Sequence, residues 1–243
     1  MAHPRSSLFA VAALRALWEQ GRVPDVLEQV LRKAWGLRFD NRRFRYIARD
    51  LMRYSKLRQI VPTDDPSRYV QDYYDQIRNL PPCVNNELFW LQFSLADIER
   101  KHFEVAERHL QQSYKIVSHM KGYDTYQIDN VQALFLLSRE IEEQKRDRAF
   151  RSLVDASKII NRQMRERRHA YYPYRVASKY GEYWRRLARH WDAEQKSIFI
   201  TACQNVYRNS QAVDADLDAM EDVTRCREIV IAILAEADAL PRA

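Results

Sequence analysis

The segment between residues 165 and 191 combines the two side-chain types that a nucleic-acid groove uses. It reads RERRHAYYPYRVASKYGEYWRRLARHW and interleaves arginines with tyrosines and tryptophans. Exposed rings beside cations could stack on bases while the cations contact phosphates. On a helical wheel, however, Tyr180 and Trp184 fall opposite Arg175 and Lys179. The phases therefore favour packing of these rings in the core and exposure of the cations, whereas Tyr171, Tyr172 and Tyr174 precede the apolar face and could be exposed.

A second set of cations lies between residues 41 and 60, where the periodicity predicts one continuous helix. In that helix a single stripe would be formed by Arg42, Arg45, Arg49, Arg53 and Lys56. The opposite, apolar side would hold Phe44, Ile47, Leu51 and Tyr54. Like charges at helical spacing repel each other. Such a row indicates either an anionic partner, which would be nucleic acid or an acidic protein face, or acidic neighbours on adjacent helices.

Positive charge is concentrated in these two regions. Residues 32–58 hold ten Lys or Arg and two Asp, a net charge of +8, and residues 162–189 hold nine Lys or Arg and two Glu, a net charge of +7. The whole chain is only +7, so the remainder is acidic, and the segment DADLDAMED at 214–222 could pair with a basic face or with another copy. The candidate residues for binding an anion or a partner are Arg42, Arg45, Arg49, Arg53, Lys56, Arg165, Arg168, Arg175, Lys179 and Arg186.

The sequence lacks recognisable catalytic and metal-binding motifs. It contains no H-E-x-x-H, no G-x-S-x-G and no glycine-rich phosphate loop. His102 and His109 lie seven residues apart, but a turn predicted between residues 100 and 103 would separate them. The three cysteines are far apart, which argues against a disulfide framework or a zinc cluster and for a reducing cytoplasm. We therefore predict a cytoplasmic protein that is not an enzyme and has no catalytic residue, metal or cofactor.

Composition and periodicity predict an all-α fold. Good helix formers are plentiful, whereas the 243 residues include only 4 Gly and 8 Pro. No apolar run reaches the ~20 residues that a membrane span requires. The connections are short, so consecutive helices should pack as antiparallel hairpins. About eleven helices are predicted, at 7–20, 24–35, 41–60, 66–79, 85–100, 103–119, 125–144, 146–167, 173–191, 193–212 and 215–238.

One pair of predicted helices has the spacing of a tetratricopeptide unit. The segment WLQFSLADIERKHFEVAERHLQQS (90–113) places bulky and small residues where the two helices of such a unit meet, although Asp97 stands where an aromatic residue is usual. The segment RDRAFRSLVDASKI (146–159) gives a second match. The predicted core residues are Trp90, Phe93, Ala106, Leu110, Ala149, Leu153 and Ala156, with Tyr180 and Trp184 from a later helix.

This spacing favours an antiparallel helix-hairpin α-solenoid, with a non-repetitive helical bundle as the alternative. In the solenoid, residues 1–61 would form a basic N-terminal helical segment and residues 62–243 the tetratricopeptide-like repeat region.

Through residues 85–160 the chain resembles the tetratricopeptide superfamily. The phrases FDNRRFRYIARDLMRYSKL (39–57), YDTYQIDNVQALFLLSREIEE (123–143) and HAYYPYRVASKYGEYW (169–184) also resemble the helical C-terminal arms of bacterial STAND-type NTPases and sirtuin-linked defence proteins. In those proteins the arm is a sensor that touches a phage protein or a partner subunit. The NTPase motif G-x-x-x-x-G-K-[ST] is missing here. The resemblance therefore implies the arm alone or a separate subunit.

Two functions are compatible with these features. The first is a non-catalytic protein-interaction or sensor module of a bacterial defence or regulatory assembly, with an NTPase or effector subunit or a phage protein as its partner. The alternative is a nucleic-acid-binding helical protein that uses the basic faces 42–56 and 162–189. Association between copies of the chain stays open, and no membrane contact is predicted.

Overall fold

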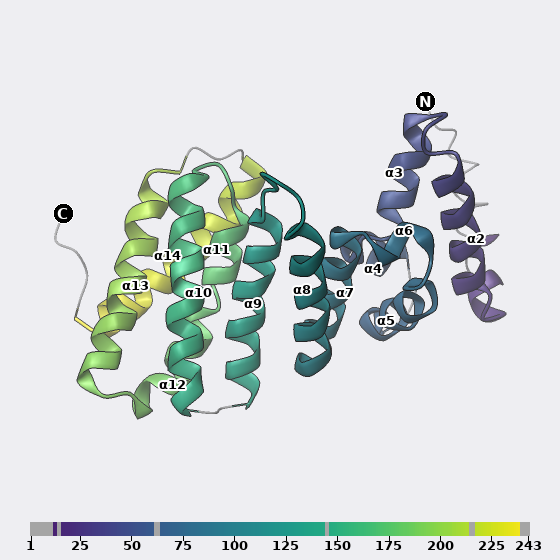
Figure 1. The fold of residues 1–243 in the computed structure, drawn as a ribbon. Coiled ribbons are helices and arrows are strands. Elements are labelled where there is room, and N and C mark those ends of the chain that lie inside the picture. Colours follow the sequence, from purple (N-terminus) through teal and green to yellow (C-terminus); the bar gives the residue numbers. More distant parts are fainter. Residues whose placement is uncertain (1–11, 14–15, 61–63, 144–145, 214–216, 239–243) are drawn as a thin grey trace. The chain divides into compact units, whose positions relative to one another are not determined.

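The chain is helical throughout the part that the structure describes. The structure is a computed structural model and describes residues 12–13, 16–60, 64–143, 146–213 and 217–238 (Figure 1). Within these ranges it has thirteen α-helices, one 3₁₀ helix and no strand, which confirms the all-α prediction. The elements are α2 (Val23–Gly36), α3 (Arg42–Asp50), α4 (Tyr54–Ile60), α5 (Pro66–Ile77), α6 (Pro81–Val84), α7 (Glu87–Glu99), α8 (Phe103–Val117), α9 (Tyr126–Glu143), α10 (Arg146–Glu166), α11 (Tyr172–Ala177), α12 (Tyr180–Leu187), η1 (Ala188–His190), α13 (Ala193–Gln211) and α14 (Leu217–Glu236).

The helix predicted at 41–60 is interrupted, because α3 ends at Asp50 and α4 begins at Tyr54. Hydrogen bonds to distant helices replace those of a continuous helix. The carbonyl of Met52 accepts from the Tyr74 hydroxyl at 2.8 Å, and the amide of Tyr54 donates to Oε1 of Gln92 at 3.0 Å. Buried backbone groups need such partners, so these contacts stabilise the interruption. The five cations of the predicted stripe are therefore divided between two helices and the turn that joins them.

The helix predicted at 173–191 is divided as well. It forms α11, α12 and the 3₁₀ helix η1. Between α11 and α12 the amide of Lys179 donates to the carbonyl of Val176, three residues back, at 3.1 Å. Such bonds tighten the backbone beyond an α-helix. These divisions and the short helix α6 explain why the described helices outnumber the eleven predicted, although half of the helix predicted at 7–20 lies outside the described residues.

The described residues pack as two units, which divide between residues 120 and 121. The boundary predicted at 61/62 falls inside the first unit, because α4 packs against α5 and α7. Tyr54, at the start of α4, has its hydroxyl 2.7 Å from that of Ser67 in α5. The change of charge along the chain therefore does not coincide with the division between the two cores.

Aromatic rings on α5 and α7 form the centre of the first unit. The ring of Tyr74 lies 5.3 Å from that of Phe89 and 5.2 Å from that of Phe93, and all three side chains are buried. α8 packs on α7 as a hairpin, and the predicted core residues Ala106 and Leu110 are buried. Small residues such as Ala106 let two helices approach closely.

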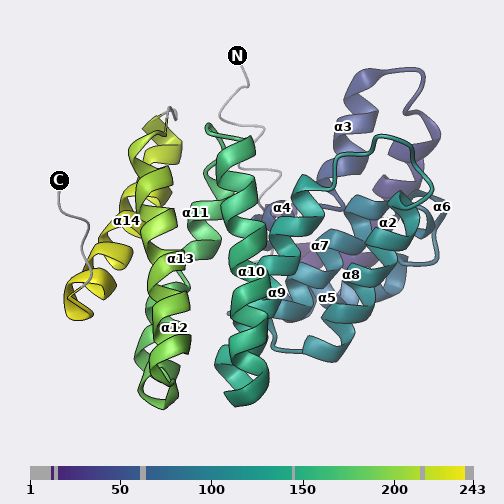
Figure 2. The same ribbon diagram turned by 60° about the vertical axis from the view of Figure 1, so that its left-hand side comes forward.

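The second unit joins the hairpins α9–α10 and α13–α14 to α11 and α12 (Figure 2). In α10 the predicted core residues Leu153 and Ala156 are buried, whereas the side chain of Ala149 lies outside the described residues. Tyr180 is fully buried, and its ring lies 5.4 Å from that of Phe199 in α13. The predicted separation of rings from cations is thus confirmed at Tyr180.

Two tryptophans predicted in the core are only partly buried. Trp90 donates its indole N–H to the carbonyl of Val84 at 3.1 Å. Trp184 stacks on Phe199 with 5.8 Å between ring centroids, and its indole N–H donates to Glu236 at 2.8 Å. An indole N–H needs a hydrogen-bond partner, so each ring keeps one edge near the surface. Both tryptophans thus pack against the core of their own unit without being fully buried.

Replacing Trp184 by Ala should therefore lower the free energy of unfolding by less than the roughly 3–5 kcal/mol typical of a fully buried aromatic residue. Phe199→Ala, at a fully buried ring in contact with Trp184, should show that full cost. Urea denaturation of both variants measures the difference. Equal losses would mean that the indole is buried more deeply than the structure shows.

A second prediction concerns Gly181, where α12 meets α14. A Cβ atom at this position would lie only 2.9 Å from Cγ2 of Ile229, which is a stiff β-branched side chain. Gly181→Leu should lower the free energy of unfolding by about 1–3 kcal/mol through overpacking. Gly36→Leu is the matched control, because nothing lies within 4 Å of a Cβ there. A loss of the same size in both variants, measured by thermal unfolding, would contradict the close contact.

Candidate functional site

The α3 surface is the more exposed of the two basic regions. We use this name for α3 and the residues that lead into it, 37–50. The helix begins at Asn41, whose side-chain oxygen accepts from the amide of Arg43 at 2.8 Å. Ala48 is the one buried residue within α3, which packs mainly against α2. The remaining sides of the helix carry the exposed cations Arg42, Arg43, Arg45 and Arg49.

Acidic side chains compensate little of this charge. Asp50 is 3.6 Å from Arg49 and 3.7 Å from Arg53, distances at which exposed ion pairs contribute little. The guanidinium groups of Arg42 and Arg49 lie over the ring of Tyr46, at 5.2 and 4.9 Å from its centroid. Within the described part of the chain, Arg45 has no ion pair. The α3 surface therefore keeps most of its positive charge.

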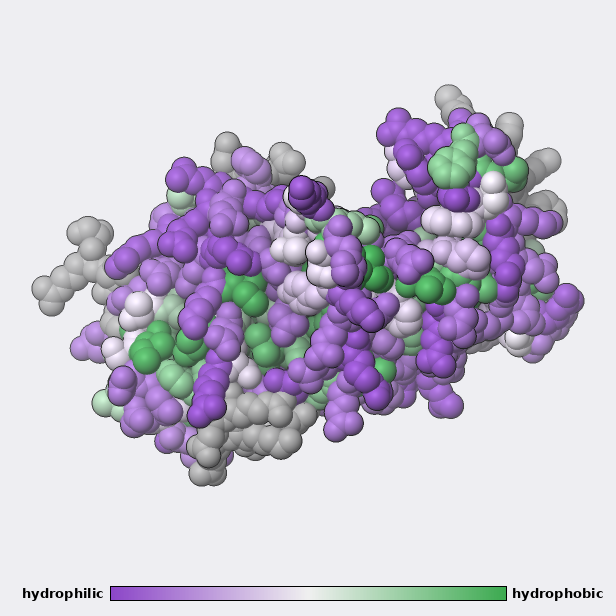
Figure 3. All heavy atoms as spheres, in the orientation of Figure 1, coloured by the Kyte–Doolittle hydropathy of each residue, from purple (hydrophilic) through white to green (hydrophobic). Residues whose placement is uncertain are grey.

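Large apolar side chains lie among these cations. Phe39 is 84% exposed and Ile47 is 42% exposed, although Ile47 was predicted to face the core. Phe44 is partly buried, and the guanidinium of Arg38 lies 4.1 Å from the ring centroids of both Trp35 and Phe39. Figure 3 shows hydrophobic residues surrounded by hydrophilic ones over α2 and α3. The surface thus combines arginines with exposed apolar groups.

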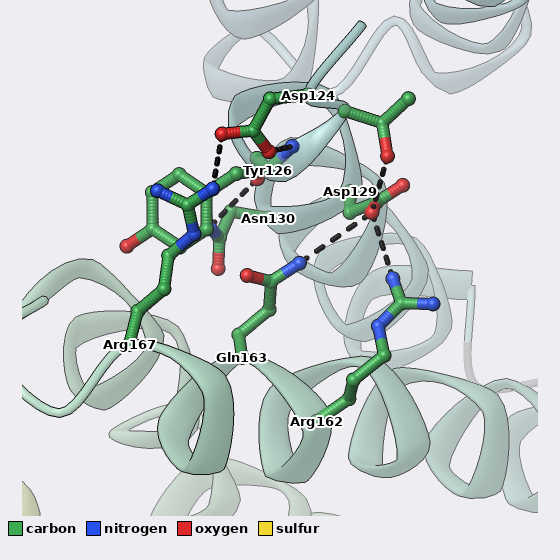
Figure 4. A network of polar contacts seen from close by, with 8 residues as sticks. Asp124, Tyr126, Asp129, Asn130, Arg162, Gln163 and Arg167 are labelled. Carbon is green, nitrogen blue, oxygen red and sulfur yellow. Dashed lines mark hydrogen bonds and ion pairs between the residues drawn. The ribbon is translucent and has the colours of Figure 1, made fainter. Parts of the chain in front are cut away.

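In the second basic region, 162–189, three cations pair with acids from other parts of the second unit. Figure 4 shows the contacts at the end of α10. Nη2 of Arg162 lies 2.7 Å from Oδ2 of Asp129, and the amide of Gln163 lies 3.4 Å from the same oxygen. Arg167 pairs with Asp124. These contacts join the first turn of α9 to the last turns of α10.

Further along this region the pairing continues. Arg175 binds Asp222 of α14 through two nitrogens, with Nη2–Oδ2 at 2.8 Å and Nε–Oδ1 at 3.1 Å. This hydrogen bond raises the pKa of the Arg175 guanidinium above its ordinary value. Arg186 pairs with Glu182 at 3.0 Å. The acidic segment 214–222 does therefore neutralise a basic face through Asp222, while the side chains of 214–219 lie outside the described residues.

The structure thus separates the candidate residues into three groups. Arg175 and Arg186 are occupied by acids within their own unit. Arg49 and Arg53 share the carboxylate of Asp50. The cations that form no ion pair with a described residue are Arg42, Arg45 and Lys56 in the first unit and Arg165, Arg168 and Lys179 in the second.

Sequence reasoning missed a polar site in the first unit. Asp97 of α7 is completely buried, and its Oδ2 lies 2.7 Å from Nδ1 of His109 in α8. Gln71 of α5 donates to the other carboxylate oxygen, and its amide nitrogen lies 3.1 Å from Nδ1 of His102. Asp97, His102 and His109 all line one pocket of about 790 Å³ between α5, α7 and α8.

Two signals in the sequence pointed to this pocket. Asp97 replaces the aromatic residue expected in a tetratricopeptide helix, and His102 and His109 lie seven residues apart. The turn between α7 and α8 was expected to separate the histidines, yet Gln71 and Asp97 connect them across it. Among the described residues, no three His, Cys, Asp or Glu side chains are placed so that they could hold a metal ion together.

The cysteines offer no reactive thiol. Cys83, Cys203 and Cys226 are buried. Burial raises the pKa of the Cys83 thiol and of the Cys226 thiol to about 12. A thiol with so high a pKa is protonated at neutral pH and is a poor nucleophile.

Comparison of the chain with protein-family models, with curated proteins and with solved structures finds no match. None of the described helices is both long enough and apolar enough to cross a membrane. The functional conclusions therefore depend on the surfaces and the pocket described above.

The buried pair Asp97–His109 gives a stability prediction. His109→Phe leaves the carboxylate without its imidazole partner and should lower the free energy of unfolding by about 3–5 kcal/mol. Adding Asp97→Leu removes the stranded carboxylate and should restore most of that loss. Urea denaturation of the single and double variants measures the recovery. A double variant no more stable than His109→Phe would show that Asp97 is held by other contacts.

Proposed function

We propose that the chain is a non-catalytic helical interaction module that uses the α3 surface to bind an acidic face of a partner protein. The observation that carries the proposal is the contrast between the two basic regions. Acids of neighbouring helices neutralise several cations of 162–189, whereas Asp50 is the main acid near those of α3. Arginines at helical spacing repel one another, and when no acid of the protein pairs with them, an anionic group of another molecule can.

The apolar groups on the same surface favour a protein as that partner. Interfaces between proteins are enriched in aromatic residues and arginine. On the α3 surface the ring of Phe39 is mostly exposed and lies against Arg38, and Ile47 projects from the same helix as the arginines. The guanidinium groups would meet carboxylates, and Phe39 would enter an apolar pocket of the partner.

The proposed scaffold is an antiparallel, tetratricopeptide-like α-solenoid. Support comes from the hairpin α7–α8, which buries Phe93, Ala106 and Leu110, and from α9–α10, which buries Leu153 and Ala156. Stacked helical hairpins commonly present extended binding surfaces. The resemblance to sensor arms of bacterial defence proteins suggests an NTPase or effector subunit, or a phage protein, as the partner.

A nucleic-acid-binding protein is the second candidate. An aromatic ring as exposed as Phe39, beside a cation, is also what stacks on an unpaired base. In that case the uncompensated cations Arg165, Arg168 and Lys179 would be expected to contribute together with α3.

The test reverses the charge of Arg42, Arg45 and Arg49 by substitution with Glu. Each residue is exposed, so thermal stability should change by no more than about 0.5 kcal/mol per substitution. Binding to the acidic partner should weaken, first through a slower on-rate. The matched control substitutes Arg165, Arg168 and Lys179 by Glu, which changes the charge equally.

Two measurements separate the candidates. Capture from the native host, with wild-type, α3-variant and control chains in parallel, should yield a protein that only the α3 variant loses. Binding to DNA and RNA is measured against salt concentration, because phosphate contacts produce a steep slope. Strong nucleic-acid binding that both triple variants weaken would replace the protein-interaction proposal with the nucleic-acid one.

A further inference from the structure

The pocket between α5, α7 and α8 contains a buried carboxylate that packing does not explain. Asp97 is 0% exposed, and a hydrophobic residue at this position would serve a helical hairpin at least as well. Burying a carboxylate costs free energy unless partners satisfy it. Here the partners come from two other helices, Gln71 of α5 and His109 of α8. The carboxylate therefore holds a particular arrangement of side chains in place.

That arrangement fixes the imidazole of His109. Its Nδ1 bonds to Asp97, and its ring stacks on Phe93 with 4.0 Å between centroids, while Trp90 lies 5.3 Å away. The carboxylate accepts a hydrogen bond, so Nδ1 carries the hydrogen and Nε2 of the neutral ring carries the lone pair. The other ring nitrogen, Nε2, has no hydrogen-bond partner within the described part of the chain, and the side chain is 11% exposed. His109 thus has one ring nitrogen available to a ligand in the pocket.

The pocket lining holds two aspartates and two arginines, and Arg108 is the cation that remains open to an anion. Each of its two carboxylates already has a partner, since Asp97 bonds to His109 and Asp75 pairs with Arg78 at 3.0 Å. Arg108 of α8 lines the same pocket, is exposed, and forms no ion pair with a described residue. The side chains of His102 and Asn79 add further donors to the lining.

We propose that this pocket binds a small organic phosphate monoester. The phosphate would lie between Arg108, which donates to its ionised oxygens, and Nε2 of His109, which accepts from the hydroxyl of a singly protonated phosphate. The organic part would pack against Trp90 and Val105, which line the same pocket. A volume of about 790 Å³ is within the range of small-molecule sites. This site is separate from the α3 surface and does not depend on the function proposed for it.

Titration calorimetry on the whole chain tests the proposal with three probes: inorganic phosphate, adenosine monophosphate and adenosine. We expect the monophosphate to bind more tightly than inorganic phosphate, and adenosine to bind weakly or not at all. Adenosine binding as tight as that of the monophosphate would overturn the anion subsite. Monophosphate binding no tighter than that of inorganic phosphate would overturn the contact of the organic part with Trp90.

The variants locate the binding. Arg108→Gln should weaken adenosine monophosphate binding roughly tenfold or more, because it removes a charged hydrogen-bond donor. The matched control is Lys115→Gln, an exposed cation on the same helix and outside the pocket lining, and it should change binding less than twofold. Equal weakening in the two variants would mean that only the general positive charge of the chain attracts the ligand.

Two further variants keep the outcome independent of folding and of the α3 surface. His109→Gln should also weaken binding, and circular dichroism shows whether this variant is still folded. If it is unfolded, the test of the pocket depends on Arg108→Gln, which changes an exposed side chain. The triple Glu variant of Arg42, Arg45 and Arg49 should bind the monophosphate as the wild type does. Loss of binding in the triple variant would place the phosphate on the α3 surface and overturn the pocket assignment.

Discussion

Both units depend on the burial of large aromatic rings, and in each unit one buried tyrosine also forms a hydrogen bond inside the protein. In the first unit the hydroxyl of Tyr74 donates to the carbonyl of Met52, and in the second the hydroxyl of Tyr180 lies 2.7 Å from that of Ser157. Burial raises the pKa of both tyrosines well above the ordinary value, so both stay neutral hydrogen-bonding groups at physiological pH. The Tyr74 bond has a consequence beyond the core, because it helps to end α3 and so divides the predicted stripe of cations between α3, α4 and the turn that joins them.

The two basic regions show that net charge along a chain does not by itself identify a binding surface. Region 162–189 carries almost as much positive charge as region 32–58. Its arginines, however, meet Asp124 and Asp129 at the start of α9 and Asp222 in α14. Such ion pairs connect one helix to the next, and the paired arginines are therefore neutralised within the second unit. On α3, where neighbouring acids are few, the charge remains available to other molecules.

The pocket of the first unit differs from the basic regions because its central polar side chains are buried. Its polar residues are partly or fully removed from water, where an unsatisfied group is costly. Gln71, Asp97 and His109 satisfy one another and pack on Phe93, so the imidazole has a defined position before any ligand arrives. A site that is organised in advance loses little conformational freedom on binding. The α3 surface, by contrast, consists of long exposed side chains that would be ordered by the partner.

Local periodicity was sufficient to predict the helical class, most helix positions and the burial of Phe93, Ala106, Leu153 and Tyr180, because the side of a helix on which a residue lies depends only on its neighbours in sequence. The interruption at Met52, the partial exposure of Trp184 and the pairing of Arg175 with Asp222 were decided by tertiary structure. Each of these depends on a residue at least 22 positions away in the chain: Tyr74, Glu236 and Asp222. The pocket around Asp97 belongs to the same class, since its carboxylate is satisfied by side chains from two other helices. Periodicity describes a single helix, whereas the partner of a buried polar group is set by which helices come together.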